Sequence, residues 1–156
     1  MMEYMNIISD ATASQIDSIL KNELENPATF VGRINGSSLH EENDVFSKIG
    51  ALFQFTNFQM ETNSNYAAFY DWMTDLYCLV NKYDSFVLVI DQFNDVFNGD
   101  FKKQATLREC LSDIIKFWTD EVEHVVVNGS KRNFSVILGT DITDSEPKKK
   151  KFLGLF

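Results

Sequence analysis

The chain has 156 residues, of which 44% are hydrophobic, and a formal net charge of −9 at pH 7. A chain of this length can bury most of its apolar surface as one domain, so its stability requires neither a metal ion nor a disulfide. We expect a single domain over residues 1–140 and a basic tail over residues 141–156.

The charge is unevenly distributed, because four consecutive lysines lie in the tail: Lys148, Lys149, Lys150 and Lys151. Without them, 10 basic residues remain against 23 acidic ones, which is a net charge of −13. Such a surface repels nucleic acid and attracts a basic protein. We interpret the tail as a disordered end; a clamp on the acidic body and a weak attachment to an anionic surface are the alternatives.

The first residues lack the basic and apolar stretches of a signal peptide. No apolar run reaches the ~20 residues that span a bilayer. We therefore expect a cytoplasmic protein without membrane attachment, in which Cys78 and Cys110 stay reduced. A disulfide between them is the less favoured alternative.

In chain order, the first helical pattern covers residues 10–24, and Pro27 ends it. This helix precedes the main α/β pattern. Residues 29–34 are typical of a short strand, which closes at the turn-forming pair Asn35 and Gly36.

The next helix is predicted to begin at a capping box made by Ser38 and Glu41. Its apolar stripe consists of Val45, Phe46, Ile49, Leu52 and Phe53. A loop then leads to a third helix, for which we expect Asn63 or Ser64 as the N-cap.

Residues 65–76 are the most informative stretch. Read as a helix at 100° per residue, they separate into an apolar side and a small or polar side. The apolar side contains Phe69, Trp72, Met73, Leu76 and Val80. The opposite side contains Ala67, Asp71, Thr74, Asp75 and Cys78. One side is predicted to join the core, and the acidic side to meet a basic partner.

Residues 86–90 are apolar throughout, as in a central parallel strand covered on both faces. Thr106 and Glu109 match a second capping box, at the start of a helix. Residues 125–127 are compatible with a loop or with a hairpin before a last strand at 134–138, and we favour the hairpin, which adds one edge strand. This alternation of helices and strands indicates an α/β fold.

Patterns typical of enzymes are missing from the sequence. There is no phosphate-binding loop to accompany Asp91 at the end of the apolar strand, and neither His40 nor His124 belongs to a metal-binding motif. Paired carboxylates are the only remaining basis for catalysis, and every acidic surface supplies them. We expect no cofactor, no metal and no enzymatic activity.

The stretch 65–76 resembles the barstar family, the intracellular inhibitors of barnase-type ribonucleases. The inhibitory helix of that family typically reads Asn, an aromatic or Leu, Asp-Ala-Leu, two further residues, then Cys-Leu-Thr-Asp-Leu. Six residues fall on this pattern in register: Asn65, Ala68, Asp71, Thr74, Asp75 and Leu76. The resemblance also takes in residues 34–36, 86–90 and 134–138, so it covers about residues 29–138.

The resemblance implies a small three-stranded parallel sheet packed with helices, to which the N-terminal helix and the extra edge strand are added. It places Asp71 at the position that enters the ribonuclease active site. A carboxylate there can replace a substrate phosphate and accept hydrogen bonds from cationic side chains. Tyr70 replaces the family's usual Trp or acid and can pack or donate at the rim. The partner-binding residues are expected to be Asn65, Ala67, Tyr70, Asp71, Thr74 and Asp75.

Two positions depart from the family pattern. Asn63 replaces a Gly, and Ala67 replaces an acid, which removes a charge from the binding face. Without the resemblance, a solvated helix face is the simpler interpretation of Asp71 and Asp75. The favoured function is an inhibitor or immunity protein, a monomer that occludes a basic ribonuclease toxin. An interaction module with a different target is the alternative, and an acidic α/β enzyme comes third.

Overall fold

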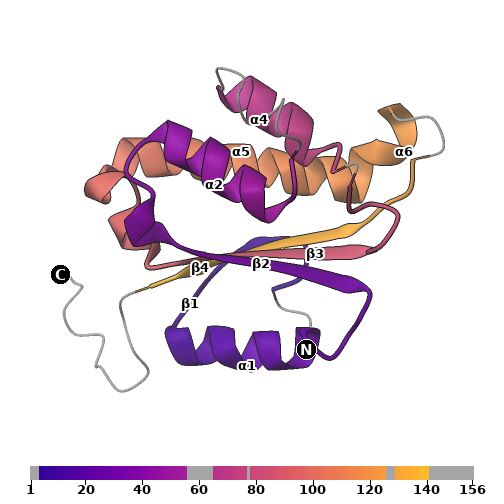
Figure 1. Cartoon of the computed structure of the whole chain (residues 1–156), viewed down its shortest axis with the longest axis horizontal. Helices are drawn as coiled ribbons and strands as arrows, with labels where there is room; N and C mark the ends of the chain where they lie inside the picture. The colour runs from indigo at the N-terminus through magenta and orange to yellow at the C-terminus, as the bar shows by residue number, and fades with distance from the viewer. Residues whose placement is uncertain (1–3, 56–64, 77, 126–128, 141–156) are drawn as a thin grey trace.

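The structure is a computed structural model that describes residues 4–55, 65–76, 78–125 and 129–140. Within these ranges one parallel sheet contains β1 (Ile8–Ala11), β2 (Thr29–Asn35), β3 (Ser85–Asp91) and β4 (Asn133–Gly139). The strand order is β1-β4-β3-β2, so β3 and β4 are central and the other two strands form the edges (Figure 1).

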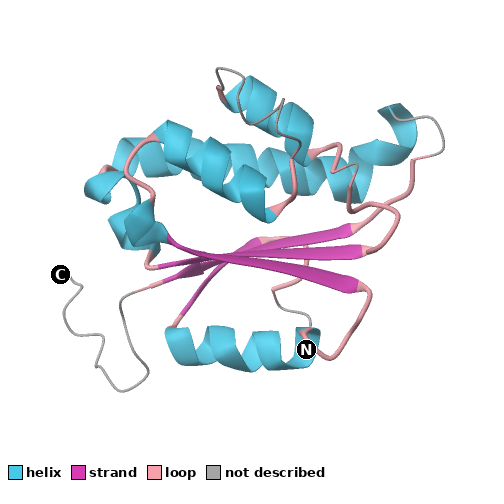
Figure 2. Cartoon of the chain, in the orientation of Figure 1, coloured by secondary structure: helices cyan, strands magenta, loops and turns pink. Residues whose placement is uncertain are grey.

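Helices cover both faces of the sheet (Figures 1 and 2). One face carries α2 (Glu42–Leu52), α4 (Tyr66–Met73) and α5 (Phe101–Lys116), whereas α1 (Ala13–Glu23) covers the other. Helix α4 is the farthest from the sheet and rests on α2 and α5. The end of α5 continues into a π-helical turn (Phe117–Glu121) and then α6 (Val122–Val125). Short 3₁₀ segments follow β2 (Gly36–Ser38) and β3 (Phe93–Gly99).

The apolar run of β3 is buried on both sides, as its composition predicts. Phe86 and Leu88 belong to the larger core beneath α2, α4 and α5. Val87 and Val89 belong to a smaller core beneath α1, together with Ile16. The N-terminal helix is therefore an integral layer, because it removes an apolar sheet face from water.

An aromatic row crosses the sheet under the helices. Phe30, Phe86 and Phe134 are opposite one another in the strand register, and their ring centroids lie 6.3 and 5.9 Å apart. Trp118 packs on Phe86 with centroids separated by 6.2 Å. This contact fixes the segment that follows α5 against the sheet.

The predicted α/β architecture and the strand at 29–34 are confirmed, but the sheet has four strands where the family resemblance implies three. The fourth strand is not the one predicted at 125–127. Val125 ends helix α6, and residues 126–127 lie outside the described residues. The extra strand is β1, which satisfies the free edge of β4, since Val136 donates to the Ile7 carbonyl and Thr140 to that of Ala11.

The first helix starts later than predicted, at Ala13, because Asp10 and Ala11 belong to β1. Thr12 caps it by accepting from the Gln15 amide. No helix within the described ranges combines the length and the apolar character needed to cross a bilayer.

The two predicted capping boxes are wrong. Ser38 donates its hydroxyl to the Asn35 carbonyl, and α2 begins four residues later, where the Asp44 carboxylate accepts from the amides of His40 and Glu41. Thr106 lies inside α5, whose N-cap is Asp100. A capping pattern also occurs by chance within a helix, so an earlier carboxylate that reaches free amides determines the start.

Candidate functional site

Helix α4 begins at a side-chain cap. The Asn65 Oδ1 atom accepts a hydrogen bond of 2.8 Å from the Ala68 amide, so Asn65 is the N-cap. The predicted caps, Asn63 and Ser64, lie outside the described residues. Asn65 therefore orders the first turn of the helix with that oxygen.

The helix is shorter than the motif predicts, because it ends at Met73. Leu76 has a φ of 45°, in the left-handed region, which no continuing α-helix allows. Thr74 turns its hydroxyl back to the Tyr70 carbonyl at 2.8 Å. Asp75 consequently lies in a turn beyond the helix and not on its last turn.

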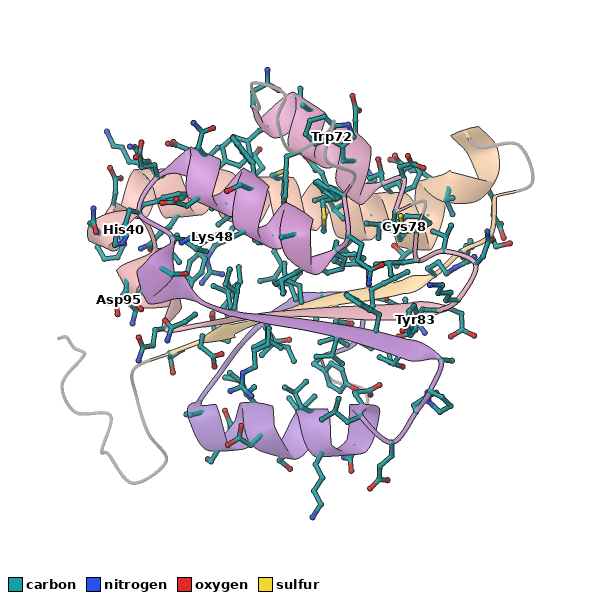
Figure 3. All side chains as sticks on the ribbon, viewed as in Figure 1. His40, Lys48, Trp72, Cys78, Tyr83 and Asp95 are labelled. Carbon is teal, nitrogen blue, oxygen red and sulfur yellow. The ribbon has the colours of Figure 1, made fainter. Side chains whose placement is uncertain are left out.

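The inner face of α4 is apolar and buried. Phe69 and Met73 are completely buried, and Leu76 is 2% exposed, as predicted. The Phe69 ring lies 5.5 Å from that of Phe46 on α2. Trp72 is half-buried and contacts Phe55 at a centroid distance of 5.6 Å; Figure 3 labels it on this outermost helix.

The outer face of α4 exposes Ala67 and Asp71, while Tyr70 is half-buried beside them. Asp75 is exposed in the following turn, and Thr74 is half-buried. The structure thus confirms that the motif separates a core face from a solvent face. It brings Ala67, Tyr70 and Asp71 into one surface.

An acidic groove of about 370 Å³ runs between α4 and α5. The residues that line the acidic groove are Tyr66, Ala67, Tyr70, Asp71, Thr106, Glu109, Cys110 and Asp113. The α5 acids Glu109 and Asp113 were not predicted as site residues. Their i, i+4 spacing beside the buried Cys110 indicates one exposed edge of a helix, but the sequence does not indicate which helix lies opposite.

The pKa of the Tyr70 phenol is affected by the charges around the acidic groove. Burial raises its pKa, and the carboxylates of Glu121, Asp113 and Asp71 raise it further. These acids come from three segments of the chain, so the field is a product of the tertiary fold. Tyr70 remains a neutral phenol at physiological pH and can donate a hydrogen bond.

Cys110 is a packed thiol. Burial, followed by the nearby charge of Asp113, raises its pKa to about 12, so the thiolate does not form at neutral pH. Both Cys110 and Cys78, labelled in Figure 3, are free, and no disulfide joins them. Cys110 thus offers no nucleophile to the groove.

A second shallow cavity, of about 300 Å³, adjoins the first on the α2 side. Glu41, Glu42 and Asn65 line it, and Tyr66 lines both cavities. Carboxylates therefore line both cavities beside α4, Glu41 and Glu42 near its start and Asp71, Glu109 and Asp113 along the acidic groove. Within the described residues, no three His, Cys, Asp or Glu side chains converge as a metal site would require. The arrangement suits the acceptance of hydrogen bonds from cationic side chains.

Comparison with known proteins places this architecture in a family. Residues 29–136 match the family model described as Barstar (barnase inhibitor). The match includes β2, α2, α4 and α5 and ends within β4, whereas β1 and α1 precede it. No curated protein and no solved structure matches the chain.

Proposed function

Because the chain belongs to the barstar family, we propose that it inhibits a basic ribonuclease by covering the enzyme's active site with helix α4. The description of the family is that of an inhibitor and not of an enzyme. A general role as an inhibitor therefore follows from membership of the barstar family. The target, and the residues that bind it, are the proposal.

The observation that carries the proposal is the position of Asp71. It is exposed on α4 at the edge of the acidic groove, with Glu109 and Asp113 on the opposite wall. A ribonuclease binds phosphates with cationic side chains. The Asp71 carboxylate can take the place of one phosphate, and the α5 acids can receive neighbouring cations.

The other predicted residues have narrower roles in this proposal. Tyr70 contributes an aromatic ring and a phenolic donor, and Ala67 contributes a small surface that permits close approach. Thr74 and Asp75 follow the buried part of the helix, so they contact the rim of the enzyme. Asn65 acts indirectly, since its side chain orders the first turn.

The setting is also part of the proposal. An inhibitor of a secreted nuclease toxin is required in the cytoplasm of the producing cell, where reduced cysteines are the rule. We propose a single domain over residues 1–140 that acts as a monomer. It catalyses no reaction in this proposal, because its carboxylates only accept hydrogen bonds from cationic side chains of the target.

A second function is favoured by one residue. Ala67 has no charge where the family pattern has an acid, which favours a target without the corresponding cation. The second candidate function is therefore that of a barstar-fold module that binds a protein other than a ribonuclease. The acidic groove favours a basic surface on either target.

The experiment is affinity capture with matched bait proteins. The full chain, Asp71→Ala and Glu25→Ala are immobilised, and the retained proteins are identified and assayed for RNA cleavage. Glu25 is an exposed acid two residues after α1, the helix that covers the opposite face of the sheet from α4. We expect a basic ribonuclease on the full chain and on Glu25→Ala but not on Asp71→Ala. Capture of a non-nuclease with the same dependence on Asp71 supports the second function instead.

A further inference from the structure

We infer that Arg132 and Trp118 are positioning residues for the candidate binding surface. Together they hold the end of α4 and the turn beyond it, which carries Thr74 and Asp75. This inference rests on the proposed function, because it concerns how the same surface is presented to the target. The two residues act through the backbone of the segment that leaves α4 and not by contact with the target.

The segment that leaves α4 is held at two carbonyl groups. The indole Nε1 of Trp118 donates to the Met73 carbonyl at 3.0 Å, where the helix ends. The guanidinium of Arg132 donates through Nη2 to the Val80 carbonyl at 2.8 Å. The first bond is buried and the second is partly buried. Water therefore competes with them less than it does at an exposed site.

A π-helical turn joins the two donors into one unit. In an α-helix the Val122 amide would donate to the Trp118 carbonyl, but here it donates to the Phe117 carbonyl, five residues back. The Trp118 carbonyl instead accepts from the Arg132 amide at 3.0 Å. Arg132 directly precedes β4, so this Trp118–Arg132 pair is attached to a central strand of the sheet.

Leu76 fixes the backbone between the two held carbonyls. Its amide donates to the Trp72 carbonyl at 3.1 Å, and its carbonyl accepts from the Val80 amide at 2.9 Å. The φ of 45° is costly for a residue with a side chain, so surrounding contacts must maintain it. The bonds to Met73 and Val80 oppose its relaxation from both sides. Asp75, which directly precedes Leu76, is held with it.

The Trp118–Arg132 pair lies outside the acidic groove. Trp118 is 3% exposed, so it offers almost no surface to a target. Arg132 is half-buried and lines a separate cavity with Asp84 and Asn133. None of the residues that line this cavity also lines the acidic groove. A change at Arg132 that keeps its charge therefore reaches the binding surface through the backbone that it holds.

Lysine cannot take the place of Arg132 in this arrangement. The guanidinium bonds the Val80 carbonyl through Nη2 and the Ser130 carbonyl, at 3.1 Å, through Nη1. A lysine ammonium is a compact charge without the planar fork that spans the two carbonyls. Arg132→Lys therefore keeps the positive charge and releases Val80. Trp118→Phe releases Met73 at the other held point.

The structural test measures residual dipolar couplings of the backbone amides in the isolated full chain. These couplings report the orientation of α4 and of the following turn relative to the sheet. We expect Arg132→Lys to change the couplings of Thr74 and Asp75 and to leave those of β3 and β4 unchanged. Lys131→Gln is the matched control, because Lys131 is an exposed neighbour and Arg132 keeps its bonds. It should leave all of these couplings unchanged.

The binding test separates position from charge and from stability. The probe is the ribonuclease that affinity capture identifies. We expect Arg132→Lys and Trp118→Phe to raise its dissociation rate about tenfold and to leave its association rate unchanged, because the net charge is kept. Lys131→Gln should leave the dissociation rate unchanged. So should Ile16→Val, which loses stability in the separate core beneath α1.

Unchanged couplings at Thr74 and Asp75 in Arg132→Lys overturn the inference, whether or not a ribonuclease is captured. Changed couplings with an unchanged dissociation rate also overturn it, because position then has no effect on binding. If Arg132→Lys does not fold, Trp118→Phe decides by the couplings of α4. Failure of the proposed function gives a different result. In that case no ribonuclease is captured, while the changed couplings still support the positioning role.

Discussion

The indole Nε1 of Trp118 donates a buried hydrogen bond of 3.0 Å to the carbonyl of Met73, the last residue of α4. This contact joins two segments 45 positions apart in the chain. Trp118 is itself held by its packing on Phe86 of the sheet. The end of the candidate binding helix is therefore anchored to the central strand through one side chain.

Trp118→Phe keeps an aromatic ring but leaves the Met73 carbonyl without its donor. The free energy of unfolding should fall by about 1–3 kcal/mol, the cost of an unsatisfied buried acceptor. Urea denaturation followed by circular dichroism measures the change. Trp72→Phe is the control, because Trp72 is half-buried on the same helix and its ring packs on Phe55. Equal losses in both variants would show that ring size matters and the hydrogen bond does not.

Asp71→Ala should leave the melting temperature unchanged and weaken binding of the captured ribonuclease by at least ~2 kcal/mol, mainly through faster dissociation. The reason is that buried cations of the enzyme lose their partner. Surface plasmon resonance gives both rates. Asp75→Ala should have an intermediate effect, since Asp75 lies at the rim.

The control for that series is Glu25→Ala, which removes one exposed charge just after α1. Glu23 is unsuitable, because it accepts a hydrogen bond from Tyr4 and its loss would also disturb the fold. Equal small effects at positions 71, 75 and 25 would mean that only net charge matters. The phosphate-replacement mechanism would then have to be abandoned.

Phe69→Ala and Met73→Ala should each lower the free energy of unfolding by about 2–5 kcal/mol, through lost burial and a cavity. Both side chains are completely buried under α4. Leu24→Ala is the control, because Leu24 is 70% exposed and its truncation should change stability little. Chemical denaturation distinguishes the outcomes. Unaffected stability in both core variants would contradict the assignment of the two faces.

Association with the ribonuclease should be fast at low ionic strength and slow markedly as salt rises, because steering is screened over about 8 Å at physiological salt. The barnase and barstar pair is a known case of this steering. Glu109→Lys combined with Asp113→Lys should reduce the low-salt rate by about tenfold and flatten the salt dependence. Stopped-flow measurement over a salt series provides the test. An association rate that does not vary with salt in the unmodified chain contradicts steering.

Stability should fall in acid through Asp44. Burial raises the pKa of this carboxyl, but hydrogen bonds from the amides of His40 and Glu41 outweigh that effect and hold the pKa below the ordinary value of 3.8. A depressed pKa in the folded state means that the stabilisation is complete above pH 3.8 and is lost as pH falls through the folded value. Asp44→Asn should therefore show a shallower loss of stability below about pH 4 in a pH series of thermal melts. An identical pH profile in the variant excludes this contribution.

The strands β2, β3 and β4 and the faces of the binding helix could be predicted, because each depends on a pattern within one segment. The apolar run from Phe86 to Ile90 is short and rich in β-branched and aromatic residues, which favours a strand covered on both sides over a buried helix. In the same way, the spacing of Phe69 and Met73 places Asp71 outside, whichever helix packs beneath. These relations need no knowledge of distant segments.

The limits of local patterns are visible at the helix ends and at the sheet edge. Ser38 and Thr106 match capping boxes, yet carboxylates elsewhere reach the free amides first. Strand β1 was not predicted, because a four-residue strand has too short a pattern and forms through the free edge of β4. Helix α4 ends before Leu76, which is buried and adopts a left-handed backbone conformation that its local sequence does not predict.

The sequence by itself determined the α/β class, the acidic charge and the outward position of Asp71, because composition and side-chain period act within a single segment. Only the tertiary structure decided that Glu109 and Asp113 face Asp71 across a groove, and that Trp118 holds the end of α4. Those relations depend on how two helices pack, 38 or more positions apart in the chain. Packing is selected by the complementarity of whole surfaces, which no local pattern records.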